Sequence, residues 1–255
     1  CIKAVPSTTK VRLDPVTHTM IRDGRQSVVN PFDSSALEVG LQMKDQLGAT
    51  VTALSMGIPD TTRLLKDCIS RGADGGYLLS DRAFAGADTL ATSYALSCAV
   101  REMEPVDLII CGKMAVDGDT AQIGPELAGV LNLPCVTDVT EILEVTRENI
   151  TLRKGIDGGQ AVVQVALPAV ITVVKDIVNP RMPSISGILR SEEAEITVKT
   201  AAAVGADPMR CGLNGSPTQV VKTFVPERTT ECVPITGSMN EMAHRLIQLA
   251  GGVKG

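Results

Sequence analysis

Short apolar runs alternate with segments of helical periodicity along the first half of the chain. The apolar runs predict strands at 50–54, 76–79 and 106–110. The segments between and after them place apolar residues on one helix face, which predicts helices at 36–47, 60–69, 88–98 and 120–131. Strands that alternate with helices favour a mostly parallel sheet with helices on both faces, so the pattern indicates an α/β fold.

Capping residues predict where several helices begin. Ser35 and Glu38 have the spacing of a capping box at the first helix, and Asp88 is a candidate N-cap. Ser238 and Glu241 repeat the capping-box spacing before a last helix that glycines end. Three helices are therefore expected to start at these polar residues.

The second half of the chain follows a different pattern. Asp157-Gly158-Gly159 stands between the runs 151–154 and 161–165, and this arrangement predicts a β-hairpin. A further strand is predicted at 167–174. Prolines and polar residues at 178–192 indicate an exposed loop.

Residues 198–237 show little periodicity and contain several glycines and prolines. So long a stretch without regular structure is uncommon inside a compact domain, which favours an arm that lies on another chain. A poorly periodic part of the same domain is the alternative. At 255 residues, 44% of them hydrophobic, the chain is large enough for one domain, alone or with an appendage.

Composition argues against several classes of partner. The net charge of −5 disfavours nucleic acid, and a chain with no Trp, two Tyr and three Phe lacks platforms on which bases stack. No apolar run reaches the roughly 18–20 residues that span a bilayer, so membrane insertion is not expected. Seven cysteines without a CxxC pair indicate reduced intracellular thiols, and we expect a cytoplasmic protein.

Metal chemistry is poorly supplied with ligands. His18 and His244 are the only histidines, which is too few for a His-based zinc site or a Ser-His-Asp triad. We therefore predict no metal site. Cys1 to Val5 resembles the end of a strand, and native residues are expected to precede it.

Residues 111–125 (CGKMAVDGDTAQIGP) carry the strongest functional signal in the chain. They lie between a predicted buried strand and a predicted helix, and they are rich in small and hydrogen-bonding residues. In an open α/β sheet, ligands bind outside the carboxyl ends of the strands. The free amides of a helix N-terminus attract phosphate. We therefore predict that this turn binds a nucleotide phosphate.

Individual side chains of the turn allow more than one role. Asp117 and Asp119 have the chemistry of a metal-binding pair, but a helix cap and bonds to the turn's own amides account for them better. The Thr120 hydroxyl and the backbone amides are the predicted phosphate ligands. Lys113 adds positive charge, and Gln122 has the donors and acceptor to bind the edge of a ring.

Residues outside the turn are candidates for other walls of the same site. Asn30 precedes a proline, where it fits a contact with an adenine or ribose and equally a bond to its own loop. Thr89 and Thr92 share one helix face, next to the candidate cap Asp88. Cys111 at a strand end fits a packing role better than a reactive one. The chain has no GxGxxG, so the conventional dinucleotide fingerprint is absent.

The chain resembles the β subunit of electron-transfer flavoproteins over nearly its whole length, and the turn at 111–125 is the most specific shared segment. The shorter shared motifs are Cys1-Ile2-Lys3-x-Val5-Pro6, Asp14-Pro15-Val16-Thr17, Asn30-Pro31-Phe32-Asp33, Arg71-Gly72-Ala73-Asp74, Asp157-Gly158-Gly159 and Leu167-Pro168-Ala169-Val170. The resemblance implies a Rossmann-like nucleotide-binding domain at 1–190, with an added β-hairpin. It also implies a C-terminal arm and helix at 191–255 that embrace a flavin-bearing α subunit.

The resemblance bears on the identity of the nucleotide. In one branch of the family the β subunit holds AMP with a structural role, and in the electron-bifurcating branch it holds a second FAD. The segments 81–93, 117–122 and 215–220 resemble the bifurcating branch. Gly118 and Ala121 keep the turn small, which suits a flavin diphosphate. FAD is therefore implied, with AMP as the alternative; the turn alone also allows a stand-alone nucleotide-binding or ATP-hydrolysing protein.

Position by position, the resemblance assigns residues of this chain to the cofactor. Cys1, Asn30 and Met56 fall on contacts with the adenosine half, and Thr89 and Thr92 fall near the isoalloxazine ring. The implied phosphate-binding loop contains Lys113, Ala115, Val116, Asp117, Gly118, Asp119, Thr120, Ala121, Gln122 and Gly124.

The resemblance also implies partners and an activity of the complex. A recognition loop at about 178–192 would dock a flavin-dependent dehydrogenase through Ile185, where the family more often has Leu. FAD would accept a hydride from NADH. One electron would then pass to ferredoxin or flavodoxin, and the other through the α-subunit FAD to the dehydrogenase. The flavin supplies this chemistry, so no side chain of the chain is expected to be catalytic.

Overall fold

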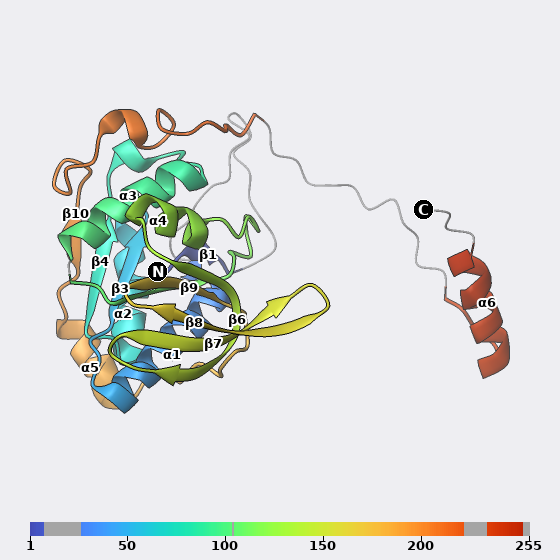
Figure 1. Ribbon diagram of the computed structural model, residues 1–255. Coiled ribbons are helices and arrows are strands. Elements are labelled where there is room, and N and C mark those ends of the chain that lie inside the picture. Colours follow the sequence, from blue (N-terminus) through green and yellow to red (C-terminus); the bar gives the residue numbers. More distant parts are fainter. Residues whose placement is uncertain (8–26, 104, 222–233, 252–255) are drawn as a thin grey trace. The chain divides into compact units, whose positions relative to one another are not determined.

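The computed structural model describes residues 1–7, 27–103, 105–221 and 234–251 (Figure 1). The chain divides into two compact units, Cys1–Val221 and Lys222–Gly255. The first unit contains the sheets and most of the helices, and the second contains one described helix.

Parallel strands form the centre of the first unit. One sheet has the order β10-β4-β3, all parallel, from Thr197–Lys199, Gly75–Leu79 and Thr52–Met56. The other has the order β5-β9-β6-β7-β8, from Leu108–Gly112, Ala169–Val173, Cys135–Val145, Asn149–Ile156 and Gly159–Ala166. Its first three strands are parallel, whereas β7 and β8 are antiparallel to their neighbours.

The first residues of the chain lie between these two sheets. The Ile2 amide donates to the Leu54 carbonyl of β3 at 2.7 Å, and the Cys1 nitrogen lies 2.6 Å from the Ile110 carbonyl oxygen of β5. Just beyond, β1 (Ala4–Pro6) pairs antiparallel with β2 (Ser27–Val29). The amino-terminal segment therefore joins β3 to β5 across the centre of the fold.

Helices cover both faces of the strands (Figure 1). On one face, α3 (Thr89–Glu102) and α4 (Ile123–Leu131) share an apolar core with β5. On the other, α1 (Pro31–Leu47) and α2 (Thr62–Arg71) bury their apolar sides. Short 3-10 turns also occur: η2 (Pro59–Thr61), η3 (Arg82–Phe84) and η4 (Pro208–Arg210). The arrangement of strands and helices confirms the predicted α/β class.

Several predicted elements occur where the pattern placed them. The glycine-rich turn joins β7 to β8, and Gly158 has the left-handed φ of +82° that such a turn requires. Asp88 caps α3 through its bond with the Ala91 amide, and Ser238 and Glu241 form the predicted capping box. That box begins α6 (Met239–Gly251), the described helix of the second unit.

Two local predictions were wrong. Ser35 and Glu38 lie inside α1, which begins earlier because Pro31 favours the first helical position, so they form no capping box. The segment predicted as an exposed loop at 178–192 contains α5 (Ile185–Glu193), whose N-cap Ser184 accepts from the Gly187 amide. The helix is short and follows Pro180 and Pro183, and its apolar residues Ile185, Ile188 and Leu189 are exposed. The prolines and polar residues of the segment therefore concealed it.

Within the described ranges, none of the helices combines the length and apolar character that a bilayer-spanning helix needs.

Candidate functional site

The turn between β5 and α4 is an ordered loop with unusual backbone angles. Lys113 continues the sheet, since its amide donates to the Val173 carbonyl at 2.8 Å. The Asp119 amide turns back to the Ala115 carbonyl at 2.8 Å. Asp119 and Ala121 adopt left-handed φ values of 51° and 55°, which are uncommon for residues with a Cβ. This backbone holds residues 116–120 on the surface beyond the carboxyl end of β5.

Asn30 fixes this loop from the start of α1. Its amide nitrogen donates to the Met114 carbonyl at 2.9 Å, and its oxygen accepts from the Val116 amide at 3.2 Å. The side chain is 1% exposed. Asn30 thus bonds the loop that follows β5 and not its own loop; its direct contact with an adenosine stays a prediction.

Asp33 bonds to the end of β5, from which the same loop begins. One oxygen accepts from the Lys3 amide at 2.8 Å, and the other accepts from the Gly112 amide at 3.2 Å. A Cβ on Gly112 would lie 2.4 Å from that second oxygen, so only glycine allows this approach. Burial raises the pKa of Asp33 to about 6, although the amides that bond to it act in the opposite direction.

The first turn of α4 has no side-chain cap. Gln122 is the N-cap residue, and its side chain makes no capping bond, so the helix cap considered for Asp119 does not form. Gly124 lies against β9, where an added Cβ would come within 2.3 Å of the Thr172 methyl group. The amino end of α4 therefore faces the loop with backbone amides and without a capping carboxylate.

Two carboxylates around the loop are paired with lysines. Lys3 bonds Asp117 at 2.6 Å, and Lys113 forms an ion pair with Asp138 of β6. Pairing leaves neither carboxylate as an isolated negative charge next to the amides of α4. In the part of the chain that the structure describes, no three His, Cys, Asp or Glu residues form a cluster able to hold a metal ion.

The starts of α3 and α4 are joined by Glu126. Its two carboxylate oxygens accept from the Thr89 and Ser93 hydroxyls, each at 3.0 Å. Thr92 lies one turn beyond Asp88 and is half-buried. The structure therefore brings the predicted Thr89 close to the amino end of α4. Sequence reasoning missed Glu126, which makes this connection.

Cys1 and Met56 are the other residues predicted to contact the adenosine half of the cofactor. Met56 is the last residue of β3 and is half-buried, so it lies at the carboxyl end of its strand, as the loop after β5 lies at the carboxyl end of β5. Cys1 is half-buried and packs against the same core as Met56. Their placement agrees with a site at these strand ends, but their contacts with a cofactor remain predictions.

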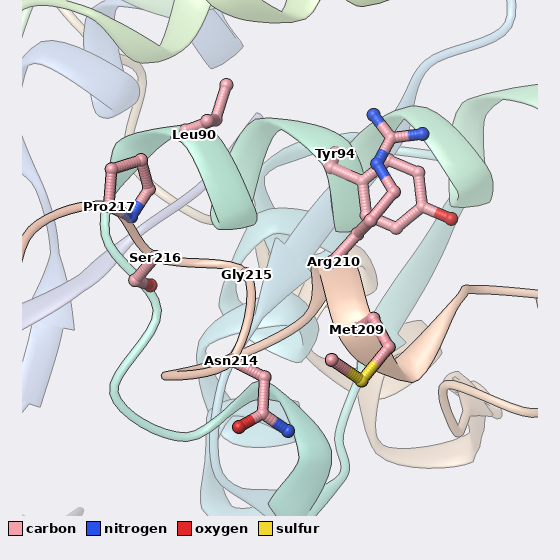
Figure 2. Close-up of a pocket in the computed structure, with 8 residues that line it drawn as sticks. All are labelled: Leu90, Tyr94, Met209, Arg210, Asn214, Gly215, Ser216 and Pro217. Carbon is pink, nitrogen blue, oxygen red and sulfur yellow. The ribbon is translucent and has the colours of Figure 1, made fainter.

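A pocket of about 360 Å³ opens next to the start of α3 (Figure 2). Its lining residues come from α3, from η4 and from the segment after η4. They are Leu90, Tyr94, Met209, Arg210, Asn214, Gly215, Ser216 and Pro217. Figure 2 shows the Arg210 guanidinium across the Tyr94 ring, 3.8 Å from its centroid. Sequence reasoning had marked 81–93 and 215–220 here, but it missed the contact of Tyr94 with Arg210, because these two residues lie far apart in the chain.

The segment with Ser216 is tied to the cap of α3. The Asp88 amide donates to the Ser216 hydroxyl at 2.8 Å, and Thr218 donates to the Asp88 carboxylate through its amide at 3.1 Å and its hydroxyl at 2.9 Å. Burial acts to raise the pKa of Asp88, but these bonds and the one from Ala91 hold it below its usual range. Residues 212–218 therefore belong structurally to the start of α3.

The parallel strands, their helices and the loop at the carboxyl edge define a Rossmann-like α/β protein. The family model of the electron transfer flavoprotein domain matches residues 17–204. The chain is 42% identical over 249 residues to caffeyl-CoA reductase-Etf complex subunit CarD of Acetobacterium woodii, which covers 97% of this chain and 95% of that protein. The chain belongs to the electron transfer flavoprotein family, with the β subunits among its relatives.

Two other relatives support this assignment. The electron transfer flavoprotein subunit beta of Thermoanaerobacterium thermosaccharolyticum is 40% identical over 248 residues, covering 97% of this chain and 95% of that protein. Protein FixA of Azotobacter vinelandii is 42% identical over 233 residues, covering 89% of this chain and 83% of that protein. The resemblance described from sequence motifs is therefore confirmed at the level of the family.

Proposed function

We propose that this chain is the β subunit of a cytoplasmic, heterodimeric electron-bifurcating flavoprotein that binds FAD at the loop after β5. The observation that carries the proposal is the loop 113–122, which is exposed at 116–120, held in place by Asn30 and followed by an uncapped helix. Such a helix end supplies backbone donors and a favourable dipole for a diphosphate. The Thr120 hydroxyl, which is on the exposed part of the loop, adds a further donor.

The loop offers open space and reduced negative charge for a phosphate group. A Cβ built on Gly118 would have no neighbour closer than the Lys3 ammonium nitrogen at 3.8 Å, so the outer side of the loop is open. Asp117 and Asp138 are neutralised by lysines, which lessens their repulsion of phosphate. These features support the phosphate-binding role of the loop.

The flavin half would extend toward the start of α3. There Glu126 fixes the Thr89 hydroxyl, and Asp88 fixes the backbone from which Thr92 projects. FAD, when bound, supplies hydride acceptance from NADH and one-electron transfer. The chain's own residues bind and orient the cofactor and shield it, and none of them is proposed to act as a catalytic acid or base.

Partners of the complex follow from the same proposal. The α subunit would carry the other FAD, and ferredoxin or flavodoxin would take the low-potential electron. A flavin-dependent dehydrogenase would dock at Ile185, whose side chain is 82% exposed on α5. Support comes from CarD, whose name assigns that relative to a caffeyl-CoA reductase complex. AMP in place of FAD, with a structural role, is the alternative.

The cofactor content of the purified complex tests this proposal. The αβ heterodimer is denatured, and its flavin and adenine nucleotides are counted by absorbance and chromatography. Two FAD per heterodimer, with flavin bleaching on addition of NADH, are expected. One FAD plus one AMP, without bleaching by NADH, would replace the proposed function with that of a non-bifurcating carrier.

A further inference from the structure

Glu38 is a buried carboxylate outside the cofactor site. It lies on α1 and is 5% exposed, and its oxygens accept only from Arg181 among the described contacts. The Arg181 backbone amide donates at 3.1 Å, Nε at 2.9 and 3.2 Å, and Nη2 at 2.9 Å. Arg181 thereby fastens the segment before α5 to the middle of α1, 143 positions earlier in the chain.

The geometry of this pair is specific to arginine. The planar guanidinium meets the carboxylate with two nitrogens, which is the fork arrangement that lysine cannot reproduce. Arg181 also pairs with the exposed Asp45 at 2.8 Å. The hydrogen bonds that Arg181 donates to Glu38, followed by those to Asp45, raise the pKa of the Arg181 guanidinium. A buried carboxylate without this partner would be strongly unfavourable, so the segment is firmly held.

The held segment leads into an exposed apolar surface. Met182 is 83% exposed, Ile185 82% and Leu189 60%. At the far end of α5, Arg190 donates to the Ile69 carbonyl of α2 at 2.9 Å and to the Ala73 carbonyl just after α2 at 3.3 Å. Figure 1 shows α5 alongside α2. The apolar surface is therefore fixed at two ends, by Arg190 on α2 and by Arg181 on α1.

We propose that Glu38 is a positioning residue for the docking of the partner dehydrogenase. Through Arg181 it sets the path of residues 181–184 and so the direction in which Met182 and Ile185 meet the partner. Glu38 is buried and touches no partner itself. A rigid surface avoids the ordering cost that a flexible recognition loop pays on binding. The inference rests on the proposed docking role of Ile185.

The test uses the αβ complex with its flavins and variants Glu38→Gln, Arg181→Lys and Ile185→Asp. The probe is caffeyl-CoA reductase of Acetobacterium woodii or an acyl-CoA dehydrogenase, whichever the wild-type complex reduces faster. We expect Glu38→Gln and Arg181→Lys to raise the KM of the probe enzyme for the αβ complex severalfold, while kcat is retained. Hydrogen exchange should increase at 180–186. Flavin content and NADH oxidation should stay at wild-type levels.

Two comparisons isolate the role of Glu38. Glu141→Gln removes one partner of an exposed ion pair with Arg153 on the β6–β7 hairpin, and it should change neither KM nor exchange at 180–186. The double variant Glu38→Gln/Arg181→Lys should raise the KM no further than the single variant with the larger effect, because both substitutions act through one contact.

Failure of this inference differs from failure of the proposed function. If Ile185→Asp raises the KM and the Glu38 and Arg181 variants do not, Glu38 has no positioning role, although docking at Ile185 stands. An unchanged KM for Ile185→Asp overturns both. Equal loss of flavin content in the Glu38 and Arg181 variants would show a general structural role and would also overturn the positioning role.

Discussion

At the scale of single residues, the site depends on polar side chains that bond to distant backbone. Asn30 and Asp33 lie next to each other at the start of α1, and together they hold the loop and the strand end that precedes it. Each makes two hydrogen bonds to backbone groups, so neither is free to serve as a simple helix cap. These bonds between protein groups hold the loop, and a loop held in this way lowers the ordering cost of binding.

Thr120→Asp tests the phosphate-binding assignment. A carboxylate next to the diphosphate would repel it, and we expect FAD affinity to fall on the order of tenfold or more. The measurement is the flavin retained by the αβ complex after gel filtration. Thr120→Asn has nearly the same shape without the charge and should retain much more flavin. Equal retention in wild type and Thr120→Asp would rule out a phosphate at this loop.

Asp33 should make the stability of the fold depend on pH. Its pKa is raised from 3.8 to about 6, so its contribution to stability is complete below pH 3.8 and is lost as pH rises through 6. We expect the free energy of unfolding to increase by about 1 kcal/mol from pH 7 to pH 5 through this group. Urea unfolding at both pH values measures it.

Two variants check that assignment. Asp33→Asn should abolish the increase in the free energy of unfolding from pH 7 to pH 5, whereas Asp74→Asn should keep it. Burial acts to raise the pKa of Asp74, but the bonds from Lys44 and Val51 outweigh it and lower that pKa. The same pH dependence in wild type and Asp33→Asn would assign the effect to another group.

At the scale of elements, glycines set how closely the helices approach their neighbours. Gly124 brings α4 against β9, and Gly187 brings α5 against α2, where a Cβ would lie 2.0 Å from the Ser70 carbonyl oxygen. On α5 this close inward face leaves Ile185, Ile188 and Leu189 on the outside. The apolar outer side of α5 is therefore a consequence of the small residues on its inner side.

Gly124→Ala and Gly129→Ala form a matched pair within α4. Thr172 is buried and its hydroxyl accepts from the Asp138 amide, so its methyl group cannot easily move away from a new Cβ at Gly124. We expect Gly124→Ala to destabilise the protein by about 1–3 kcal/mol. Gly129 has no neighbour within 4 Å of an added Cβ, and Gly129→Ala should stabilise by roughly 0.5–1 kcal/mol. Thermal unfolding that ranks them in reverse would contradict this packing.

Ile185→Asp tests the outer side of α5. A charge in place of this exposed side chain should leave folding intact, because the helix is held through Gly187 and Arg190. Electron delivery to the dehydrogenase should fall by about tenfold or more, as for a central interface residue. NADH oxidation by the β-subunit flavin should continue at the wild-type rate. Equal loss of both activities would contradict a docking role.

At the scale of the whole molecule, the first unit extends beyond the predicted boundary at 190. β10 pairs with β4, and the Asp207 amide donates to the Tyr94 hydroxyl at 2.9 Å. The contacts of the described residues divide the chain after Val221. The proposal that the C-terminal part packs on the α subunit therefore applies best to the second unit, whose α6 has exposed apolar residues such as Leu246 and Ile247.

Truncation separates the two boundaries. A chain that ends at Val221 should unfold at nearly the wild-type temperature but associate weakly with the α subunit. A chain that ends at Arg190 also loses the end of α5, β10 and the bonds to Tyr94 and Asp88, so its melting temperature should fall by several degrees. Circular dichroism and gel filtration with the α subunit measure both effects. Full association of the shorter chains would contradict the arm.

Local sequence determined the α/β class, most strands and helices, the β7–β8 hairpin and the position of the turn after β5. These features depend on apolar periodicity, capping residues and glycine, which act over a few neighbouring residues. The motif that carries the resemblance, residues 111–125, is also continuous in sequence. The family could therefore be inferred from the sequence alone.

Only the tertiary structure decided which distant residues meet. Asn30 reaches Met114, Glu38 reaches Arg181, Thr89 reaches Glu126 and Tyr94 reaches Arg210. The outward apolar face of α5 likewise depends on its contact with α2. A hydrogen bond between residues 143 positions apart leaves no periodic signal in either segment, because it depends on how the elements pack and not on what each element is.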